Sequence, residues 1–245
     1  MNKTYLYPYS AEEARRRNEM SLWRASHKAN LACKEEIELA IGTHFDGTHL
    51  EEGCAEGVIR EYGYKRVQWV LSHTIQQLDW SDRFSQANKE WARQTYIPKD
   101  RAHVTDLIIV SDPAVVDLFA TQFQCAYQEL GLFGPTQCEP NSFEKLDYEG
   151  KVLVLSTDTL KETYWTPQAQ LWYAHDGFGC SPKAIGRSIR CTCLGDGEMT
   201  RWNRTDFIGV LKDEFLPDWA KEKLMELKGQ EQNNDSPAMG GMTME

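Results

Sequence analysis

The sequence predicts an α+β protein: a helical N-terminal domain followed by a small antiparallel β-rich module with a closing C-terminal helix. Apolar residues recur every three or four positions in the first part, which is the period of an amphipathic helix. After a connector at 131–150 that contains glycine and proline, short β-branched runs take over. The last residues are polar and rich in glycine and methionine. We therefore expect a helical domain at 1–135, a β-rich module at 136–228 and a disordered tail at 229–245.

The N-terminal domain should consist of helices that follow one another closely. Ser10 and Glu13 form a capping box, so the first helix should begin directly after Ser10. A second, long helix should run from about Leu22 to a stop near Gly42, with an apolar or small residue at every third or fourth position. The run LIIV at 107–110 is short and β-branched and predicts a strand. Further helices are expected at 51–62, 64–78, 85–91 and, opened by Asp112 and Pro113, at 112–131.

The C-terminal module should be a small sheet. Asp196-Gly197 is the strongest short hairpin signal in the chain, so the strand before it should turn back there. Pro217 should start a last helix that ends near Lys228. Runs with the composition of strands lie at 151–156, 170–174 and 187–194.

Charge and composition narrow the class of protein. The formal net charge is −10, and general attraction to nucleic acid is disfavoured because it depends on Lys and Arg that neutralise phosphates. No uncharged apolar run approaches the ~20 residues that span a bilayer, and the N-terminal residues lack the apolar core of a signal peptide. We therefore expect a cytoplasmic protein without a membrane partner, whose seven cysteines are reduced thiols.

The predicted hairpin is the most informative segment. A two-residue turn at 196–197 would place Thr192 opposite Arg201 and Arg190 opposite Asn203. Side chains alternate between the faces of a sheet, so these four share one face. Arginine is suited to bidentate contact with carboxylate or phosphate, so this face is either a recognition surface or an ordinary solvated one. The opposite face should be the core side, with Ile189, Cys191, Cys193 and Trp202.

The segment RWNRTD at 201–206 extends the polar face. It gathers charged and amide side chains around one tryptophan, which is more recognition chemistry than the end of a strand requires. We therefore predict a partner-binding surface, made of Arg190, Arg201, Asn203, Arg204 and Asp206.

We expect no metal, no cofactor and no catalytic residues. Cys191 and Cys193 share the core face of a strand, whereas structural zinc takes closely spaced cysteine pairs on loops. Cys33 and His27 lie six residues apart on one helix and face different directions, so they do not form a nucleophile and base pair. Neither a GxSxG, HExxH or P-loop string nor a Rossmann string occurs. The groups of metal-ligating residue types that we weighed are His175, Cys180, Cys191 and Cys193, and the loop residues His44, Asp46 and His49, which lack a fourth ligand.

Several segments resemble known families. NLACKEEIELAI, YGYKRVQWVLSHTIQ and DRFSQANKEWA resemble an uncharacterised domain-of-unknown-function family, numbered in the thirty-eight hundreds, from conjugative transposons and related mobile elements of Gram-positive gut bacteria. QLWYAHDGFGCSPKAIGRSIRCTCLGDGEMTRWNRTDFIGVL is similar to the large-polyvalent-protein-associated domains of those elements. Together these segments extend over roughly residues 4–228. The resemblance implies a genetic setting and carries over no catalytic residue. The N-terminal residues that match the family-like motifs include Arg66, Asp82, Arg83, Asn88 and Trp91.

From the residues and the resemblance together we expect a non-catalytic accessory protein of a mobile genetic element. Its partner should be a protein or a protein–nucleic-acid complex, and the resemblance implies that it counters a host defence system. One alternative is a metal-dependent enzyme acting on nucleic acid or nucleotide, with Asp196, Glu198 or Asp206 on the metal, which requires these carboxylates to converge. Another is a direct DNA- or RNA-binding protein that uses the arginine face, which predicts salt-dependent binding to a duplex.

Overall fold

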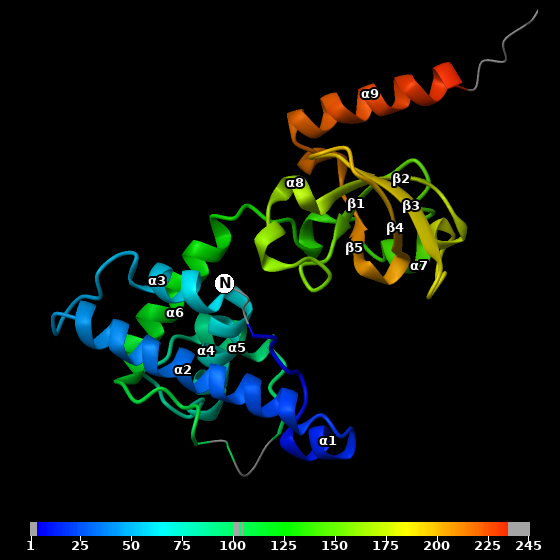
Figure 1. Ribbon diagram of the computed structural model, residues 1–245. Coiled ribbons are helices and arrows are strands. Elements are labelled where there is room, and N and C mark those ends of the chain that lie inside the picture. The colour runs from blue at the N-terminus through cyan, green and yellow to red at the C-terminus, as the bar shows by residue number, and fades with distance from the viewer. Residues whose placement is uncertain (1–3, 100–102, 104, 235–245) are drawn as a thin grey trace, which may run out of the picture. The chain divides into compact units, whose positions relative to one another are not determined.

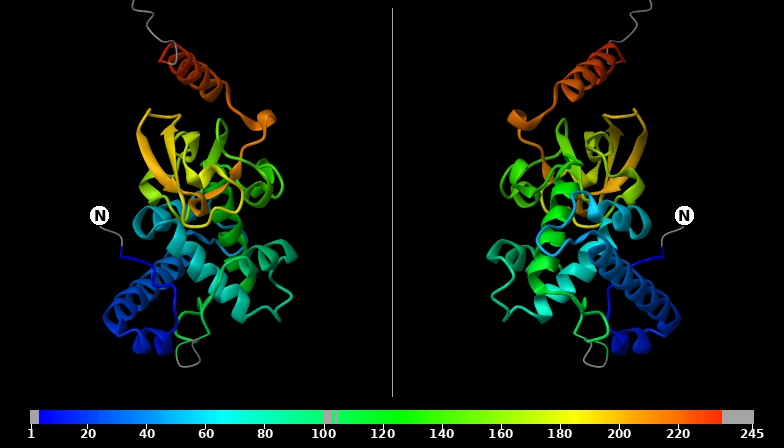
Figure 2. Two further views of the ribbon diagram at one scale, coloured as in Figure 1. Left: turned by 90° about the vertical axis from the view of Figure 1, so that its right-hand side faces the viewer. Right: turned by 90° about the vertical axis from the view of Figure 1, so that its left-hand side faces the viewer.

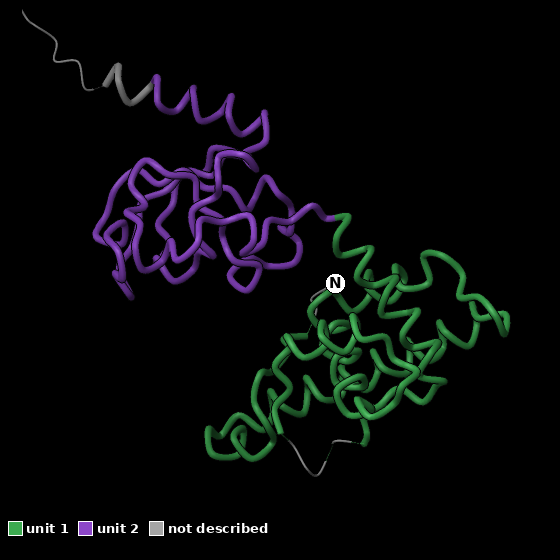
Figure 3. The backbone as a smooth tube through the Cα atoms, turned by 180° about the vertical axis from the view of Figure 1, so that it is seen from behind, with its two compact units in different colours: residues 1–129 green, residues 130–245 purple. Residues whose placement is uncertain are grey.

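The computed structural model describes residues 4–99, 103 and 105–234. The chain divides into two compact units, residues 1–129 (unit 1) and residues 130–245 (unit 2), which Figure 3 shows in different colours. Unit 1 is helical, and unit 2 contains a five-stranded antiparallel sheet followed by a helix (Figure 1). The predicted α+β class is therefore confirmed.

The helices of unit 1 begin where the sequence supplies caps. Ser10, Ser85 and Asp112 each accept a hydrogen bond from a backbone N–H of the following first turn, which satisfies one of its free donors. Gly63, at the junction of two helices, has a φ of 85°, which glycine adopts without strain. The helices are α1 (Ala11–Arg16), α2 (Met20–His44), α3 (Cys54–Tyr62), α4 (Tyr64–Gln77), α5 (Gln86–Arg93) and α6 (Pro113–Gln128).

The core of unit 1 lies between α2, α3, α4 and α6. The buried stripe of α2 includes Cys33, Ile37 and Ile41, as its spacing predicts. The predicted apolar stripe began at Leu22, but Leu22 is 51% exposed, so the prediction that this residue is buried was wrong. The predicted strand at 107–110 was also wrong, because these residues form a loop between α5 and α6. Within it, Leu107 and Ile109 are nevertheless buried, which explains the apolar composition.

Unit 2 is built on a sheet with the strand order β4-β3-β2-β1-β5. The predicted strands correspond to β1, β2 and β3, whereas β5 was missed. The short helices α7 (Ser142–Lys145) and α8 (Pro167–Gln170) lie in the connections before β1 and β2. The strands are β1 (Val152–Leu155), β2 (Leu171–Asp176), β3 (Ser188–Cys193), β4 (Met199–Asn203) and β5 (Phe207–Val210).

Both faces of this sheet pack against other parts of unit 2. The face that carries Trp172, Cys191 and Trp202 packs against connecting segments that include Tyr148 and Cys180. The opposite face packs against the last helix, α9 (Asp218–Asn234), which Figures 1 and 2 show beside the sheet. The face predicted to be polar is thus covered in part, and its polar residues lie toward β4. The apolar side chains buried on that face are Val152, Val154, Leu171, Tyr173, Leu194 and Ala220.

The β3–β4 hairpin has the predicted faces and a different register. Arg190 pairs with Arg201, and not with Asn203 as predicted. The cause is the turn, in which four residues, 194–197, separate the paired Cys193 and Glu198 instead of two. A shift of two residues leaves every side chain on its face, so the predicted membership of both faces is confirmed.

The end of the chain differs from its prediction. α9 continues to Asn234, beyond the expected end near Lys228, so the first residues of the predicted tail are helical. The rest of that tail, residues 235–245, lies outside the described residues. Within the described part of the chain, the helices are all too short or too polar to cross a membrane.

Candidate functional site

A row of charged side chains crosses three strands at one end of the unit 2 sheet. The register puts Asp176 of β2 beside Arg190 of β3, and Arg190 beside Arg201 of β4. Arg190 Nη2 donates to Asp176 Oδ2 at 2.5 Å, and this hydrogen bond lowers the pKa of Asp176. The side chains of Arg190 and Asp176 remain 42% and 57% exposed, and Arg201 is exposed as well. These three residues, the arginine row, form an accessible polar surface that contains two of the predicted partner-binding arginines.

Asn203 and Asp206 lie at the end of β4. Asn203 is exposed, and its backbone N–H donates to Asp206 Oδ2 at 2.8 Å. Asp206 closes a 3₁₀ turn at Arg204–Asp206, and its backbone oxygen accepts a hydrogen bond from the Ser156 N–H. The side chains of Asn203 and Asp206 therefore form a reciprocal cap of this turn, at the end of the strand that carries Arg201.

Arg204 does not belong to the surface, and its prediction as a partner-binding residue was wrong. Its side chain is fully buried. Within the described residues, all the hydrogen bonds that its guanidinium donates end on backbone carbonyl oxygens. The guanidinium also lies 3.5 Å from the ring centroid of Tyr148. Arg204 therefore holds connecting segments together, and its acceptors are the carbonyl oxygens of Ser142, Phe143, Leu146, Gly179 and Cys180.

The loop at 177–187, which joins β2 to β3, displays exposed apolar side chains. Phe178 is 85% exposed and Ile185 is 72% exposed. The loop is held tightly at its base, because a Cβ atom on Gly177 would lie 2.6 Å from the backbone oxygen of Ser188. Sequence reasoning had missed this display of apolar side chains.

The residue groups weighed as metal sites have other roles. Cys180, Cys191 and Cys193 are buried in the core, and burial raises the pKa of each thiol. His175 Nε2 lies 2.7 Å from Thr192 Oγ1 in a side-chain hydrogen bond. The loop with His44 and His49 is closed by Asp46, whose carboxylate accepts hydrogen bonds from the backbone N–H groups of His49 and Thr48. These hydrogen bonds lower the pKa of Asp46 to about 2.

A group of potential metal ligands occurs elsewhere, in unit 1. Among the described residues, one set of His, Cys, Asp or Glu side chains brings three ligand atoms within 4.8 Å of one another: His27, His103 and Asp106. Asp196, Glu198 and Asp206 do not converge in this way. The alternative of a metal-dependent enzyme built on those three carboxylates therefore has no geometric basis in the described structure.

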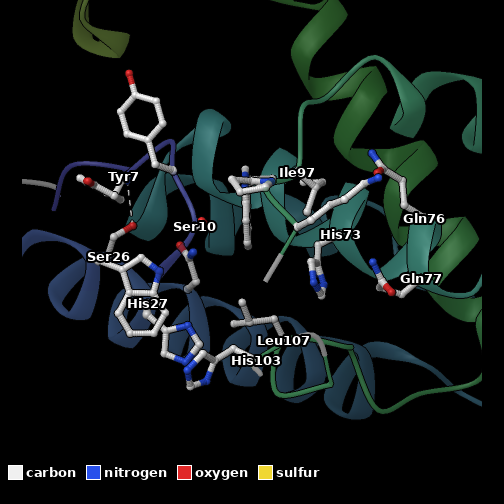
Figure 4. Close-up of a pocket in the computed structure, with 16 residues that line it drawn as sticks. Tyr7, Ser10, Ser26, His27, His73, Gln76, Gln77, Ile97, His103 and Leu107 are labelled. Carbon is white, nitrogen blue, oxygen red and sulfur yellow. Dashed lines mark hydrogen bonds between the residues drawn. The ribbon is translucent and has the colours of Figure 1, made fainter. Parts of the chain in front are cut away.

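A pocket of about 350 Å³ lies in unit 1, between α2, α4 and the segments that precede α1 and α6 (Figure 4). Its walls combine tryptophan, histidine and amide side chains, and no carboxylate is among the residues that line it. His73 is 4% exposed, and its Nδ1 has no hydrogen-bond partner within the described part of the chain. Burial lowers the pKa of His73 to about 4, against a smaller opposite effect of a hydrogen bond to the Leu107 backbone. The polar residues on the wall include Ser26, His27, Asn30, His73, Gln76, Gln77, Lys99 and His103.

Sequence reasoning had missed this pocket. Trp23 and His27 lie one helical turn apart on α2, and their rings stack at 4.8 Å with an interplanar angle of 11°. That spacing is visible in the sequence, but the third ring, His103, comes from a distant segment and lies 5.0 Å from Trp23 and 5.1 Å from His27. Only the fold brings the rings together.

Four of the N-terminal residues that carry the family resemblance, Arg66, Arg83, Asn88 and Trp91, have contacts that stabilise unit 1. Arg66 is buried and donates hydrogen bonds to Ser26 and Asn30 of α2 and to Thr4. The other three residues connect α5, or the segment that precedes it, with α6 or its N-cap residue Asp112. Arg83 forms an ion pair with Asp112, and Asn88 Nδ2 donates a hydrogen bond to Asp117 Oδ1 at 2.7 Å. The ring centroids of Trp91 and Phe123 lie 5.7 Å apart.

These observations define a two-unit α+β protein with a polar pocket in its helical unit and an arginine row on its sheet unit. The chain belongs to the family described as "Protein of unknown function (DUF3849)", whose model matches residues 6–128, half of the chain and nearly all of unit 1. No curated protein and no solved structure matches the chain.

Proposed function

We propose that the protein is a non-catalytic accessory protein of a mobile genetic element, and that unit 2 binds a macromolecular partner. The observations that carry this proposal are two exposed parts of unit 2, the arginine row and the loop at 177–187, which together are the candidate surface of the proposal. Phe178 and Ile185 extend from that loop with most of their surface exposed. They line one hollow together with Lys183 and Arg187. Apolar or aromatic side chains next to arginine are the composition of the energetically important centre of protein interfaces.

The charges of this surface indicate what the partner presents. Lys183, Arg187 and Arg201 are exposed, and the nearby carboxylate of Asp176 is already bonded to Arg190. The surface therefore complements carboxylates or phosphates. The net charge of −10 opposes non-specific attraction to nucleic acid, which favours a protein or a protein–nucleic-acid complex as the partner. The resemblance to mobile-element modules supports a partner from a host defence system.

The test begins with isolation of the partner by affinity purification from a host cell that carries the element, followed by binding measurements with the purified partner. Arg201→Glu should weaken binding at least about fivefold, because losing an arginine anchor at an interface costs more than about 1 kcal/mol. The same change should leave the melting temperature nearly unchanged, since the new carboxylate would face Arg190 across the strands. Arg24→Glu, on an exposed position of α2 in unit 1, alters the net charge equally and should bind as the wild type does.

Equal binding by wild type, Arg201→Glu and a Phe178→Ala variant would place the interface outside this surface. Direct binding of purified protein to DNA or RNA, weakening steeply with salt and lost in Arg201→Glu but not in Arg24→Glu, would support the nucleic-acid alternative instead.

A further inference from the structure

We propose that His27, His103 and Asp106 form a binding site in unit 1 for a divalent transition-metal ion of the zinc class. Their ligand atoms all lie within 4.8 Å of one another. Two imidazoles and a carboxylate are a common donor set for zinc and its neighbours, with ligand distances of about 2.0–2.2 Å to the metal. Side-chain movements on the order of 1 Å would therefore bring the three atoms onto one ion.

Aromatic contacts hold the two imidazoles in position. The His27 ring stacks on Trp23, and the His103 ring lies at 60° to the His27 ring with centroids 5.1 Å apart. Asp106 Oδ2 lies 3.1 Å from His103 Nδ1, so the carboxylate is already directed at this group. In Figure 4 the His27 and His103 rings lie side by side at one end of the pocket.

The backbone beside Asp106 is anchored to α4. Thr74 Oγ1 accepts a hydrogen bond from the Ile109 N–H at 3.1 Å and donates to the Leu107 carbonyl oxygen at 3.4 Å. Leu107 itself is 4% exposed. The segment that supplies one ligand is therefore fixed to the same helical core as α2, which supplies another. A site whose ligands come from rigid elements loses less entropy when it binds an ion.

The surroundings select the kind of ion and its coordination. Calcium and magnesium prefer oxygen ligands, whereas two of these three donors are imidazole nitrogens. Three protein ligands leave at least one position of a tetrahedral ion open. His27 and His103 both line the pocket, so the open position would face a cavity of about 350 Å³ that can admit water or a small ligand. This proposal replaces the sequence-based expectation that the protein binds no metal.

The experiment uses the full-length protein after treatment with a chelator. Zn²⁺ is titrated by calorimetry and Co²⁺ by visible absorption, and we expect one ion per chain with a nitrogen–oxygen ligand spectrum. His27→Ala and His103→Ala should each lower the affinity at least about 100-fold, because even the loss of an outer-shell partner costs 10–100-fold. Asp106→Asn should lower it as well. Circular dichroism on each variant establishes that it is folded, and His27→Gln keeps the size of the side chain if the alanine variant is not.

Two matched controls exclude adventitious binding. His49→Ala removes an exposed imidazole from the other histidine-containing loop, and Cys125→Ser removes the exposed thiol. Both should bind one ion with wild-type affinity. The proposal is overturned if the wild type binds no ion, if His27→Gln and His103→Ala bind as tightly as the wild type, or if either control variant loses the ion. Wild-type affinity in Asp106→Asn would overturn the assignment of the carboxylate as a ligand.

Discussion

Unit 1 and unit 2 each bury an arginine, and the two guanidinium groups bind different parts of the chain. Arg66 in unit 1 is 4% exposed and Arg204 in unit 2 is fully buried. Arg66 donates to Ser26 and Asn30 of α2 and, at 2.7 Å, to the carbonyl oxygen of Thr4, so it attaches the N-terminal segment to a helical core. Arg204 donates to carbonyl oxygens of two connecting segments around α7 and β3. Both of these oxygens also accept a backbone N–H, so in unit 2 the arginine adds a second donor to them and links the two segments.

The units also differ in how they bury a titratable group. Arg204 keeps its charge inside unit 2, where the carbonyl oxygens and the face of Tyr148 solvate it. Burial lowers the pKa of Arg204, but a guanidinium remains protonated under all ordinary conditions. His73 in unit 1 instead has a depressed pKa, and burial favours its neutral form. A basic side chain can therefore be buried in its charged form when its N–H groups are hydrogen-bonded, as in Arg204, or in its neutral form, as in His73.

The largest loss of stability should follow from removing the buried guanidinium of Arg204 in unit 2. Arg204→Met keeps much of the apolar stem and leaves the carbonyl oxygens of Leu146 and Gly179 without their donor, whereas Ser142, Phe143 and Cys180 also accept backbone N–H groups. Each such group costs about 1–3 kcal/mol, so the free energy of unfolding should fall by about 4 kcal/mol or unit 2 should fail to fold. Urea denaturation measures this. Arg201→Met, on the exposed side of the same hairpin, should change it by no more than about 0.5 kcal/mol. If Arg204→Met lowers the free energy of unfolding by no more than Arg201→Met does, the prediction is wrong and water replaces the guanidinium as the donor.

The corresponding change in unit 1 should be costly but smaller. Arg66→Met removes the donor to Ser26, Asn30 and Thr4, and we expect a loss of about 3 kcal/mol from unsatisfied buried acceptors. The N-terminal segment can move into water and recover part of the loss, because Thr4 itself is exposed. Limited proteolysis should then cut before α1, and denaturation should measure the loss. Arg83→Met, which breaks an exposed ion pair with Asp112, should cost at most about 1 kcal/mol. Equal losses in the free energy of unfolding for Arg66→Met and Arg83→Met would show that the buried arginine contributes no more than an exposed ion pair.

Local signals in the sequence were sufficient for most of the elements. Ser10 and Asp112 are caps whose effect is confined to one helical turn, and both predictions were correct. The faces of the β3–β4 hairpin could be predicted because they depend only on alternation along a strand. The pairing of Arg190 could not, since it depends on the number of residues in the turn. The LIIV run was misjudged because burial in a loop and burial in a strand select the same apolar residues.

The candidate sites depend on contacts between distant segments, and these were less accessible to prediction. Arg204 and Arg201 look alike in the sequence, and the carbonyl oxygens that surround Arg204 belong to backbone, which carries no compositional signal. The group of His27, His103 and Asp106 likewise requires the loop before α6 to return to α2. Sequence reasoning found the arginine row because both of its arginines lie in one hairpin, where pairing is local.

The smallest predicted effect is an acid sensitivity of unit 1 that unit 2 should lack. The pKa of His73 is lowered from 6.5 to about 4, chiefly by burial, so between these values the unfolded chain binds a proton that the folded unit excludes. The contribution of neutral His73 to stability is therefore complete above pH 6.5 and is lost progressively as the pH falls from 6.5 to about 4. Between pH 7 and pH 5 the loss should be about 2 kcal/mol.

Hydrogen exchange of the metal-free protein, corrected for intrinsic rates, measures this loss separately in α4 of unit 1 and β3 of unit 2. We expect protection of α4 to fall between pH 7 and pH 5 by the factor that about 2 kcal/mol represents, roughly 30-fold, while protection of β3 changes much less. His73→Gln keeps a polar group in place but cannot take up a proton in this range, so it should abolish the difference between the units. His49→Gln, in an exposed loop of the same unit, should retain it. Equal losses of protection in α4 and β3 would contradict the prediction, because they would show that acid does not act chiefly at the site that encloses His73.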